Sequence, residues 1–89
     1  MKTLVEKTTP DGEISNLSKY LFEDNETVTL LESHIVVGDP VEFHIGCHNS
    51  SDSTLFTNIT PPDDWVGNKY KYTTDDGWVE VEGWVDPNE

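Results

Sequence analysis

The chain has 89 residues, a length that supports one hydrophobic core, so we expect a single domain over residues 1–89. Its 18 Asp and Glu residues outnumber five basic residues, all of them Lys, and give a formal net charge of −13. Nucleic-acid phosphates and anionic membrane surfaces both attract basic patches, so this charge argues against direct nucleic-acid binding and against membrane association. No apolar run approaches the roughly 20 residues that a membrane-spanning helix needs.

Apolar residues recur with a period of two and are interrupted every eight to twelve residues by Gly, Pro, Asp and Asn. This rhythm predicts an all-β fold, a small antiparallel meander that forms a sandwich or a partly open barrel. We expect residues 1–17 to be an edge strand or a mobile arm, because the segment 8–16 is loop-like in composition. Residues 86–89 are expected to form a loose tail.

The first predicted hairpin is centred on Asp24-Asn25-Glu26, which is flanked by residues 19–23 and 27–33. A three-residue loop would place Phe22 opposite Val28 and so join two apolar faces. A two-residue loop would pair Phe22 with a polar residue, so the three-residue loop is preferred.

A further strand is predicted over residues 34–37, ended by Gly38-Asp39-Pro40, because proline removes a ladder donor and favours a turn. The clearest alternation follows over residues 41–47. It predicts one buried face made of Val41, Phe43, Ile45 and Cys47. The polar run over residues 48–54 is expected to be an exposed loop.

The C-terminal part predicts a β-hairpin with Asp76-Gly77 as a two-residue turn between residues 69–75 and 78–84. A shift by one residue would oppose Tyr72 to an acidic residue, so the pattern favours one register. Its pairs are Tyr72 with Val81, Tyr70 with Gly83 and Thr74 with Val79 on the core side, and Lys71 with Glu82 and Lys69 with Trp84 outside. Residues 61–67 contain two prolines and are predicted to form the preceding loop.

Three potential metal ligands, His44, Cys47 and His48, lie within five residues. On a strand the two histidines would be about 13 Å apart and Cys47 would point to the opposite face. We therefore predict no metal site, but a buried cysteine beside two surface histidines. A nucleophilic Cys47 would need an orienting group and an oxyanion loop, and neither is recognisable.

The acidic residues carry no specific catalytic pattern. Glu80 and Glu82 would share a strand face about 6.6 Å apart, but any Glu-x-Glu strand gives this spacing. Asp63-Asp64 and Asp75-Asp76 are interpreted as turn residues rather than calcium ligands. Because no phosphate-binding loop or dinucleotide motif is present, we predict no catalytic residue, no cofactor and no metal, and we do not expect an enzyme.

The tryptophans give a better functional indication. Two of them fall on the predicted outer face of the last strand and the third lies in a loop, and exposed aromatic residues often mark a contact surface. The alternative is that a second sheet covers this face and buries both strand tryptophans. The candidate interaction surface consists of Trp65, Trp78, Trp84, Glu80 and Glu82.

Several segments resemble small acidic uncharacterised proteins of phages infecting marine cyanobacteria. They are Tyr20-Leu21-Phe22-Glu23-Asp24, Val37-Gly38-Asp39-Pro40, Asn49-Ser50-Ser51 with Ser53-Thr54-Leu55, and Asp64-Trp65-Val66-Gly67-Asn68-Lys69-Tyr70. The resemblance covers residues 18–78, with Asp75-Asp76-Gly77-Trp78 similar to the end of those proteins and the N-terminal segment as an addition. It implies a phage origin and supplies no activity, cofactor or catalytic residue.

A single cysteine excludes an internal disulfide and fits a reducing compartment, and residues 1–7 contain no continuous apolar segment of the signal-peptide type. Together with the resemblance, these features imply the host cytoplasm during infection, or the virion, as the location.

We therefore expect a non-enzymatic viral structural or protein-interaction protein, such as a self-assembling or virion-accessory subunit. It would act through a protein partner or as a homo-oligomer. The first alternative is an acidic inhibitor of a host nucleic-acid-binding protein, whose carboxylates take the place of phosphates. A further alternative is a carbohydrate- or small-ligand-binding module that uses the tryptophan face.

Overall fold

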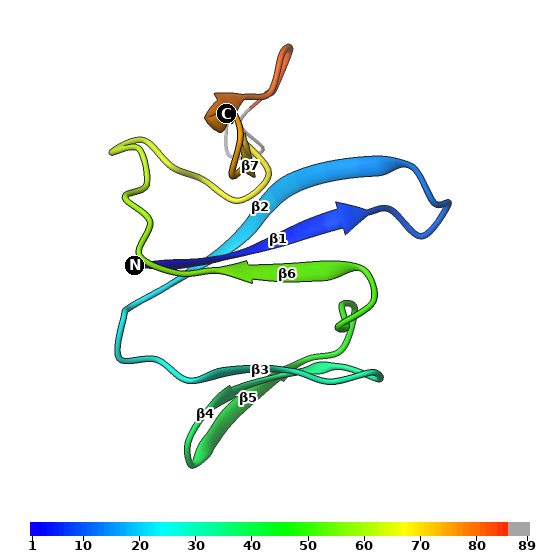
Figure 1. Cartoon of the computed structure of the whole chain (residues 1–89), viewed down its shortest axis with the longest axis vertical. Helices are drawn as coiled ribbons and strands as arrows, with labels where there is room; N and C mark the ends of the chain where they lie inside the picture. The colour runs from blue at the N-terminus through cyan, green and yellow to red at the C-terminus, as the bar shows by residue number, and fades with distance from the viewer. Residues whose placement is uncertain (86–89) are drawn as a thin grey trace.

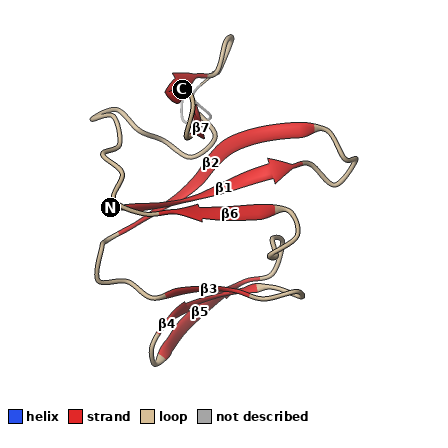
Figure 2. Ribbon diagram, viewed as in Figure 1, coloured by secondary structure: helices blue, strands red, loops and turns tan. Residues whose placement is uncertain are grey.

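The computed structural model describes residues 1–85, which form eight β-strands and no helix (Figure 2). The strands are β1 (Lys2–Thr8), β2 (Ile14–Phe22), β3 (Val28–Leu30), β4 (Ile35–Gly38), β5 (Val41–Ile45), β6 (Ser53–Phe56), β7 (Tyr70–Thr73) and β8 (Gly77–Glu80). The predicted tail over residues 86–89 lies outside the described residues.

The strands form two antiparallel sheets that face each other (Figure 1). The larger sheet has the order β6-β1-β2-β7-β8 and the smaller has the order β3-β4-β5. The predicted all-β, antiparallel class is confirmed, as two layers and not as a closed barrel. Only β3-β4-β5 follows the chain as a simple meander, and β7-β8 is the predicted C-terminal hairpin.

Strand β1 lies inside the larger sheet, between β2 and β6. Its consecutive residues Leu4 and Val5 are both buried, at 0% and 1% exposure, although successive side chains of a strand point to opposite faces. Both faces of β1 are therefore covered. The prediction of an edge strand or mobile arm over residues 1–17 is wrong, because β1 has a hydrogen-bonded neighbour on each side.

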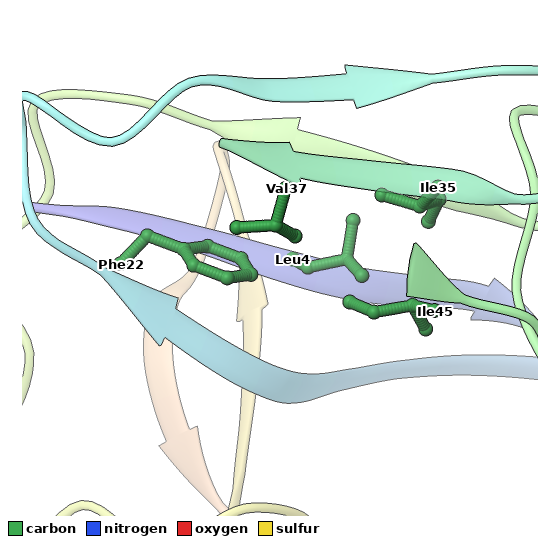
Figure 3. Close-up of a cluster of buried hydrophobic side chains, with 5 residues drawn as sticks. All are labelled: Leu4, Phe22, Ile35, Val37 and Ile45. Atoms are coloured by element: carbon green, nitrogen blue, oxygen red, sulfur yellow. The ribbon is translucent and has the colours of Figure 1, made fainter. Parts of the chain in front are cut away.

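The main core fills the space between the sheets (Figure 3). Leu4 and Phe22 project from the larger sheet and meet Ile35, Val37 and Ile45 from the smaller one. All five are at least nine-tenths buried, so each contributes about 1.5 to 3 kcal/mol of transfer free energy. This small set of side chains holds the two layers together.

The predicted hairpin around residues 24–26 is wrong. Strand β2 pairs with β1 and β7, whereas β3 pairs with β4 in the other sheet. The segment between them crosses from one layer to the other (Figure 1). Phe22 and Val28 do pack into the same core, but across the two sheets and not as ladder neighbours.

The predicted strand and turn over residues 34–40 are confirmed as β4 and its connection to β5. Gly38 has a φ of +100°, and a Cβ there would lie 2.8 Å from the backbone nitrogen of Glu42. Only glycine fits this conformation without displacing the backbone. The turn therefore fixes β5 against β4, with Val37 opposite Phe43.

Strand β5 ends at Ile45, and its predicted buried face is mostly wrong. Ile45 is buried, but Val41 is 54% exposed, Phe43 is 46% exposed and Cys47 is exposed. Phe43 shares a side with Ile45, but β5 is the edge of the smaller sheet and this end of it is not covered. A register shift between Val37 and Gly38 gives β5 one extra residue, Glu42, so Val41 lies opposite Gly38 and does not continue the alternation. The loop that follows is also not wholly exposed, because His48 is buried, as is Ser53 at the start of β6.

The C-terminal hairpin forms in a different register. Tyr72 lies opposite Trp78 and not Val81, so β8 is displaced by three residues from its predicted position. The turn is longer than predicted because the Thr73 Oγ1 accepts a hydrogen bond of 3.1 Å from the Asp76 backbone, and Gly77 adopts a φ of +67°. Successive side chains of a strand point to opposite faces, so a displacement by an odd number of residues turns the other set of β8 side chains toward the face of Tyr72.

Replacing Leu4 with alanine should lower the free energy of unfolding by about 2 to 5 kcal/mol, because Leu4 is fully buried between the sheets. Leu31→Ala is the matched control, since Leu31 is 40% exposed and should lose less than about 1 kcal/mol. Chemical denaturation followed by tryptophan fluorescence measures both. Equal losses would contradict this placement of the core.

Candidate functional site

The outer face of the larger sheet carries a second packed region beneath the loop 57–69. Val5 lies opposite Ser18 in the β1–β2 ladder, and the Trp65 Nε1 donates a 2.9 Å hydrogen bond to the Ser18 Oγ. The Thr3 Oγ1 donates to the Tyr20 carbonyl at 2.9 Å, so in its 2.6 Å contact with Ser18 it accepts. Trp65 therefore anchors the loop to the sheet.

Aromatic rings continue from this region onto β7 and β8. The Trp78 ring lies 4.8 Å from the Tyr72 ring and 6.2 Å from the Tyr70 ring, the second in an edge-on arrangement. The Phe56 ring of β6 lies 4.9 Å from Tyr72, although β6 and β7 are separated by two strands in the sheet. The larger sheet is therefore curved, which brings the Phe56 and Tyr72 side chains into contact.

Lys69 lies between two rings and a carboxylate. Its Nζ is 2.8 Å from the Asp64 Oδ2, 5.7 Å from the centre of the Tyr70 ring and 5.4 Å from the centre of the Trp84 ring. The Val81 backbone N–H donates to the Lys69 carbonyl at 2.8 Å, which brings the end of the hairpin back toward this lysine. The predicted ladder pairing of Lys69 with Trp84 is wrong, because Lys69 lies opposite Val81, and the two side chains meet only through a cation–π contact.

Asp64 also organises Tyr70. The Tyr70 hydroxyl donates a 2.7 Å hydrogen bond to the Asp64 Oδ1 and lies 3.5 Å from the Glu80 Oε2. The hydrogen bond to Asp64 raises the pKa of Tyr70 to about 12, with burial and the two negative charges acting in the same direction. Hydrogen bonds from Lys69 and Tyr70 lower the pKa of the Asp64 carboxyl.

We call this group the β7–β8 aromatic surface, consisting of Asp64, Lys69, Tyr70, Tyr72, Trp78, Glu80 and Trp84. Of the predicted interaction residues it includes Trp78, Trp84 and Glu80. The two tryptophans are half-buried and Glu80 is exposed. Trp65 is also half-buried and is bound to Ser18, and Glu82 lies beyond the end of β8, so it does not share a strand face with Glu80.

The predicted group of His44, Cys47 and His48 is dispersed. His44 is exposed, with its ring 5.0 Å from the His34 ring, and Cys47 is exposed rather than buried. His48 is buried and packs edge-on against Tyr20 at 6.5 Å. The chain leaves β5 after Ile45, so the strand geometry assumed for this segment does not apply.

His48 instead faces two carboxylates that the sequence pattern did not indicate. Its Nδ1 lies 3.8 Å from the Glu6 Oε2 and 3.9 Å from the Asp52 Oδ1, and it makes no hydrogen bond within residues 1–85. Burial of Asp52 favours its neutral form, but hydrogen bonds from the Asn49 backbone and the Ser53 hydroxyl, with His48 nearby, lower its pKa. The Lys7 backbone N–H donates to the Asp52 carbonyl at 2.7 Å and so brings these residues together.

Within residues 1–85, no group of three or more His, Cys, Asp or Glu side chains is arranged to hold a metal ion. Both oxygens of Asp64 accept hydrogen bonds from Lys69 and Tyr70, so this residue stabilises the loop. The backbone of Asp76 is part of the hairpin turn.

A cavity of about 240 Å³ lies on the other side of the hairpin, lined by Asn16, Lys71, Thr73, Asp76, Gly77 and Val79. Lys71 and Val79 are ladder partners and point away from Tyr72 and Trp78. Its volume is below the roughly 300 to 1,000 Å³ of typical small-molecule sites. We therefore assign no ligand to it.

No protein family, curated protein or solved structure matches this chain. Residues 1–85 contain no helix that could cross a membrane.

Replacing Ser18 with alanine should lower the free energy of unfolding by about 1 to 3 kcal/mol, because it leaves the Trp65 Nε1 without its partner beneath the loop. Ser51→Ala is the matched control, since Ser51 is exposed and its change should be within about 0.5 kcal/mol. Urea denaturation measures both. A Ser18→Ala protein as stable as the control would show that the Trp65 anchor contributes nothing.

The Tyr70 hydroxyl should ionise at a pH near 12, against an ordinary value of 10.0, when tyrosinate absorbance is followed through an alkaline titration. Because the folded pKa is raised, its contribution to stability is complete below pH 10.0 and is lost as the pH rises through about 12. Asp64→Asn should move this ionisation toward the ordinary value. Asp63→Asn removes the same charge one residue away and should leave it in place, and an unchanged midpoint in Asp64→Asn would refute the assignment.

Proposed function

We propose that this chain is a non-enzymatic protein-interaction module that binds a basic segment of a partner protein on the β7–β8 aromatic surface. The observation that carries this proposal is the position of Lys69, whose ammonium group lies against two aromatic rings and one carboxylate. The surface therefore already binds one primary ammonium group, that of Lys69. The same kinds of ring and carboxylate contact would recognise a lysine of a partner protein. The resemblance of residues 18–78 to cyanophage proteins supports a phage origin.

The rings next to Lys69 provide the additional contact area. Trp78, Trp84 and Tyr72 are half-buried, so each is held by the fold while part of the ring stays accessible. Tryptophan and tyrosine are the residues most often found at the energetic centres of protein interfaces. Exposed Glu80 lies beside them and would attract arginine or lysine.

The overall charge favours the same class of partner. A formal charge of −13 on 89 residues produces a negative field that accelerates the approach of a basic protein and repels nucleic acid. This field alone also supports the alternative function, an inhibitor whose carboxylates occupy the phosphate sites of a host nucleic-acid-binding protein. The two proposals differ in whether binding is localised at the aromatic surface or spread over all the acidic residues.

An Arg- and Lys-rich synthetic peptide serves as the probe, with binding measured by calorimetry at two salt concentrations. The variant Asp64→Asn/Glu80→Gln, which removes both carboxylates of the surface, should weaken binding about 3- to 10-fold, which corresponds to about 0.7 to 1.4 kcal/mol. Trp84→Ala should weaken it by a similar factor, because it removes one ring.

The matched control is Asp11→Asn/Glu13→Gln, which removes two exposed charges from the loop between β1 and β2. This control should change the affinity less than 2-fold if binding is localised. Equal weakening by both double variants would instead favour charge mimicry, and an unaffected Trp84→Ala would remove the aromatic surface from the binding site.

A further inference from the structure

Strand β8 forms an edge of the larger sheet directly beside the β7–β8 aromatic surface. It is the last strand of the order β6-β1-β2-β7-β8, and β7 is its only ladder partner among residues 1–85. Its four residues pair with β7 without a register shift, so the edge is regular. A regular, uncovered strand edge is a template for an extended segment of another chain.

The hydrogen-bond pattern of the hairpin determines which backbone groups face this edge. The Val81 N–H donates to the Lys69 carbonyl at 2.8 Å, so these two residues form a hydrogen-bonded pair. Such pairs alternate with non-hydrogen-bonded pairs along an antiparallel ladder, so Val79 is the next residue of β8 whose backbone faces β7. The N–H and C=O groups of Trp78 and Glu80 therefore face away from β7, toward the open edge.

The side chains of the same two residues lie on the aromatic surface. Trp78 is the ladder partner of Tyr72, and the two rings are 4.8 Å apart. Glu80 is the ladder partner of Tyr70, and its Oε2 lies 3.5 Å from the Tyr70 hydroxyl oxygen. Val79 points to the opposite face and is 46% exposed. An added strand would therefore meet a ring and a carboxylate on one face and an apolar side chain on the other.

We propose that the basic partner segment binds as an added antiparallel strand on the β8 edge, with lysine or arginine at alternate positions and an apolar residue between them. One basic residue lies opposite Glu80 as an ion pair, and the next lies opposite Trp78 and contacts its ring. The apolar residue between them lies opposite Val79. This inference rests on the proposed function and specifies how the partner is bound.

Antiparallel pairing suits the groups that face the edge. Every ladder within residues 1–85 is antiparallel. In this orientation each basic residue exchanges two backbone hydrogen bonds with the β8 residue opposite it. The backbone therefore contributes affinity, and the side chains of Trp78 and Glu80 select the sequence.

Charge selects a basic segment for this edge in preference to a second copy of the chain. Strand β8 has one carboxylate and no basic residue, and the formal net charge of −13 makes two copies repel each other. The other edge strands lack this combination. Strand β5 is interrupted by the extra residue Glu42, β3 has only three residues, and β6 contains no charged residue.

Backbone N-methylation of a peptide probe tests the pairing. The probe is a synthetic peptide with blocked ends in which lysine alternates with valine, and calorimetry measures its affinity. N-methylation of every lysine removes the donors that face β8 and should weaken binding about 10-fold or more, since at least two hydrogen bonds are lost. N-methylation of every valine is the matched control. These N–H groups face solvent, so the affinity should change less than about 3-fold.

Hydrogen exchange followed by NMR tests the same register in the protein. In the free chain, the Val79 N–H should exchange more slowly than those of Trp78 and Glu80, because only Val79 faces β7. Saturating unmodified peptide should slow exchange at Trp78 and Glu80 by about 10-fold or more and leave Val79 unchanged. Protection that appears without any slowing at Trp78 and Glu80 would overturn the β8 pairing.

Two substitutions at one position separate the backbone from the charge. Glu80→Gln removes the carboxylate alone, whereas Glu80→Pro also removes the N–H that faces the edge and should bind the peptide about 5- to 10-fold more weakly than Glu80→Gln. Circular dichroism checks that both variants are folded. Equal affinities of the two folded variants, or equal effects of lysine and valine methylation, would overturn the edge pairing and leave the proposed function intact. An unmodified peptide that does not bind would refute the proposed function and this binding mode together.

Discussion

The structure depends on the pairing of β1 on both of its edges. With β2 on one side and β6 on the other, β1 places Leu4 in the core between the sheets and Val5 beneath the loop 57–69. Two consecutive buried residues require cover on both faces, which the smaller sheet supplies on one side and the loop with Trp65 on the other. Without β1, Phe22 would be the one remaining member of the buried core cluster that the larger sheet supplies, and the layers would otherwise be joined by the connections from β2 to β3 and from β5 to β6.

The parts of the fold that could be predicted are those with a local signal. Alternating apolar residues and the Gly38-Asp39-Pro40 turn located β4 and β5, and the sequence around Gly77 located the last hairpin. The pairing of β1 with β6 joins Thr3 to Phe56, and no short-range pattern encodes a contact over that separation. The loop around residues 24–26 has the composition of a hairpin turn, and the same composition also suits a crossing between layers.

The candidate site shows the same division between local and long-range information. The alternation indicated that Tyr70 and Tyr72 point to one side, and Tyr70 is indeed buried. The three-residue change of register then brought Trp78 to that side, because a hydrogen bond from the Asp76 backbone N–H to the Thr73 Oγ1 accompanies a longer turn. Asp64 could not be placed from the sequence, since its contacts with Lys69 and Tyr70 depend on how the loop closes. Glu6 and Asp52 meet His48 only through the pairing of distant strands.

The charge that favours a basic partner also constrains how two copies of this chain can meet. Acidic chains repel one another, so an apolar edge on this protein does not lead to unrestricted aggregation. On β5 the backbone adds a second obstacle, because the register shift between Val37 and Gly38 leaves Glu42 as an extra residue and interrupts the regular edge of the strand. Bulges and charged residues on edge strands both hinder pairing with another chain, so this edge is protected in two ways.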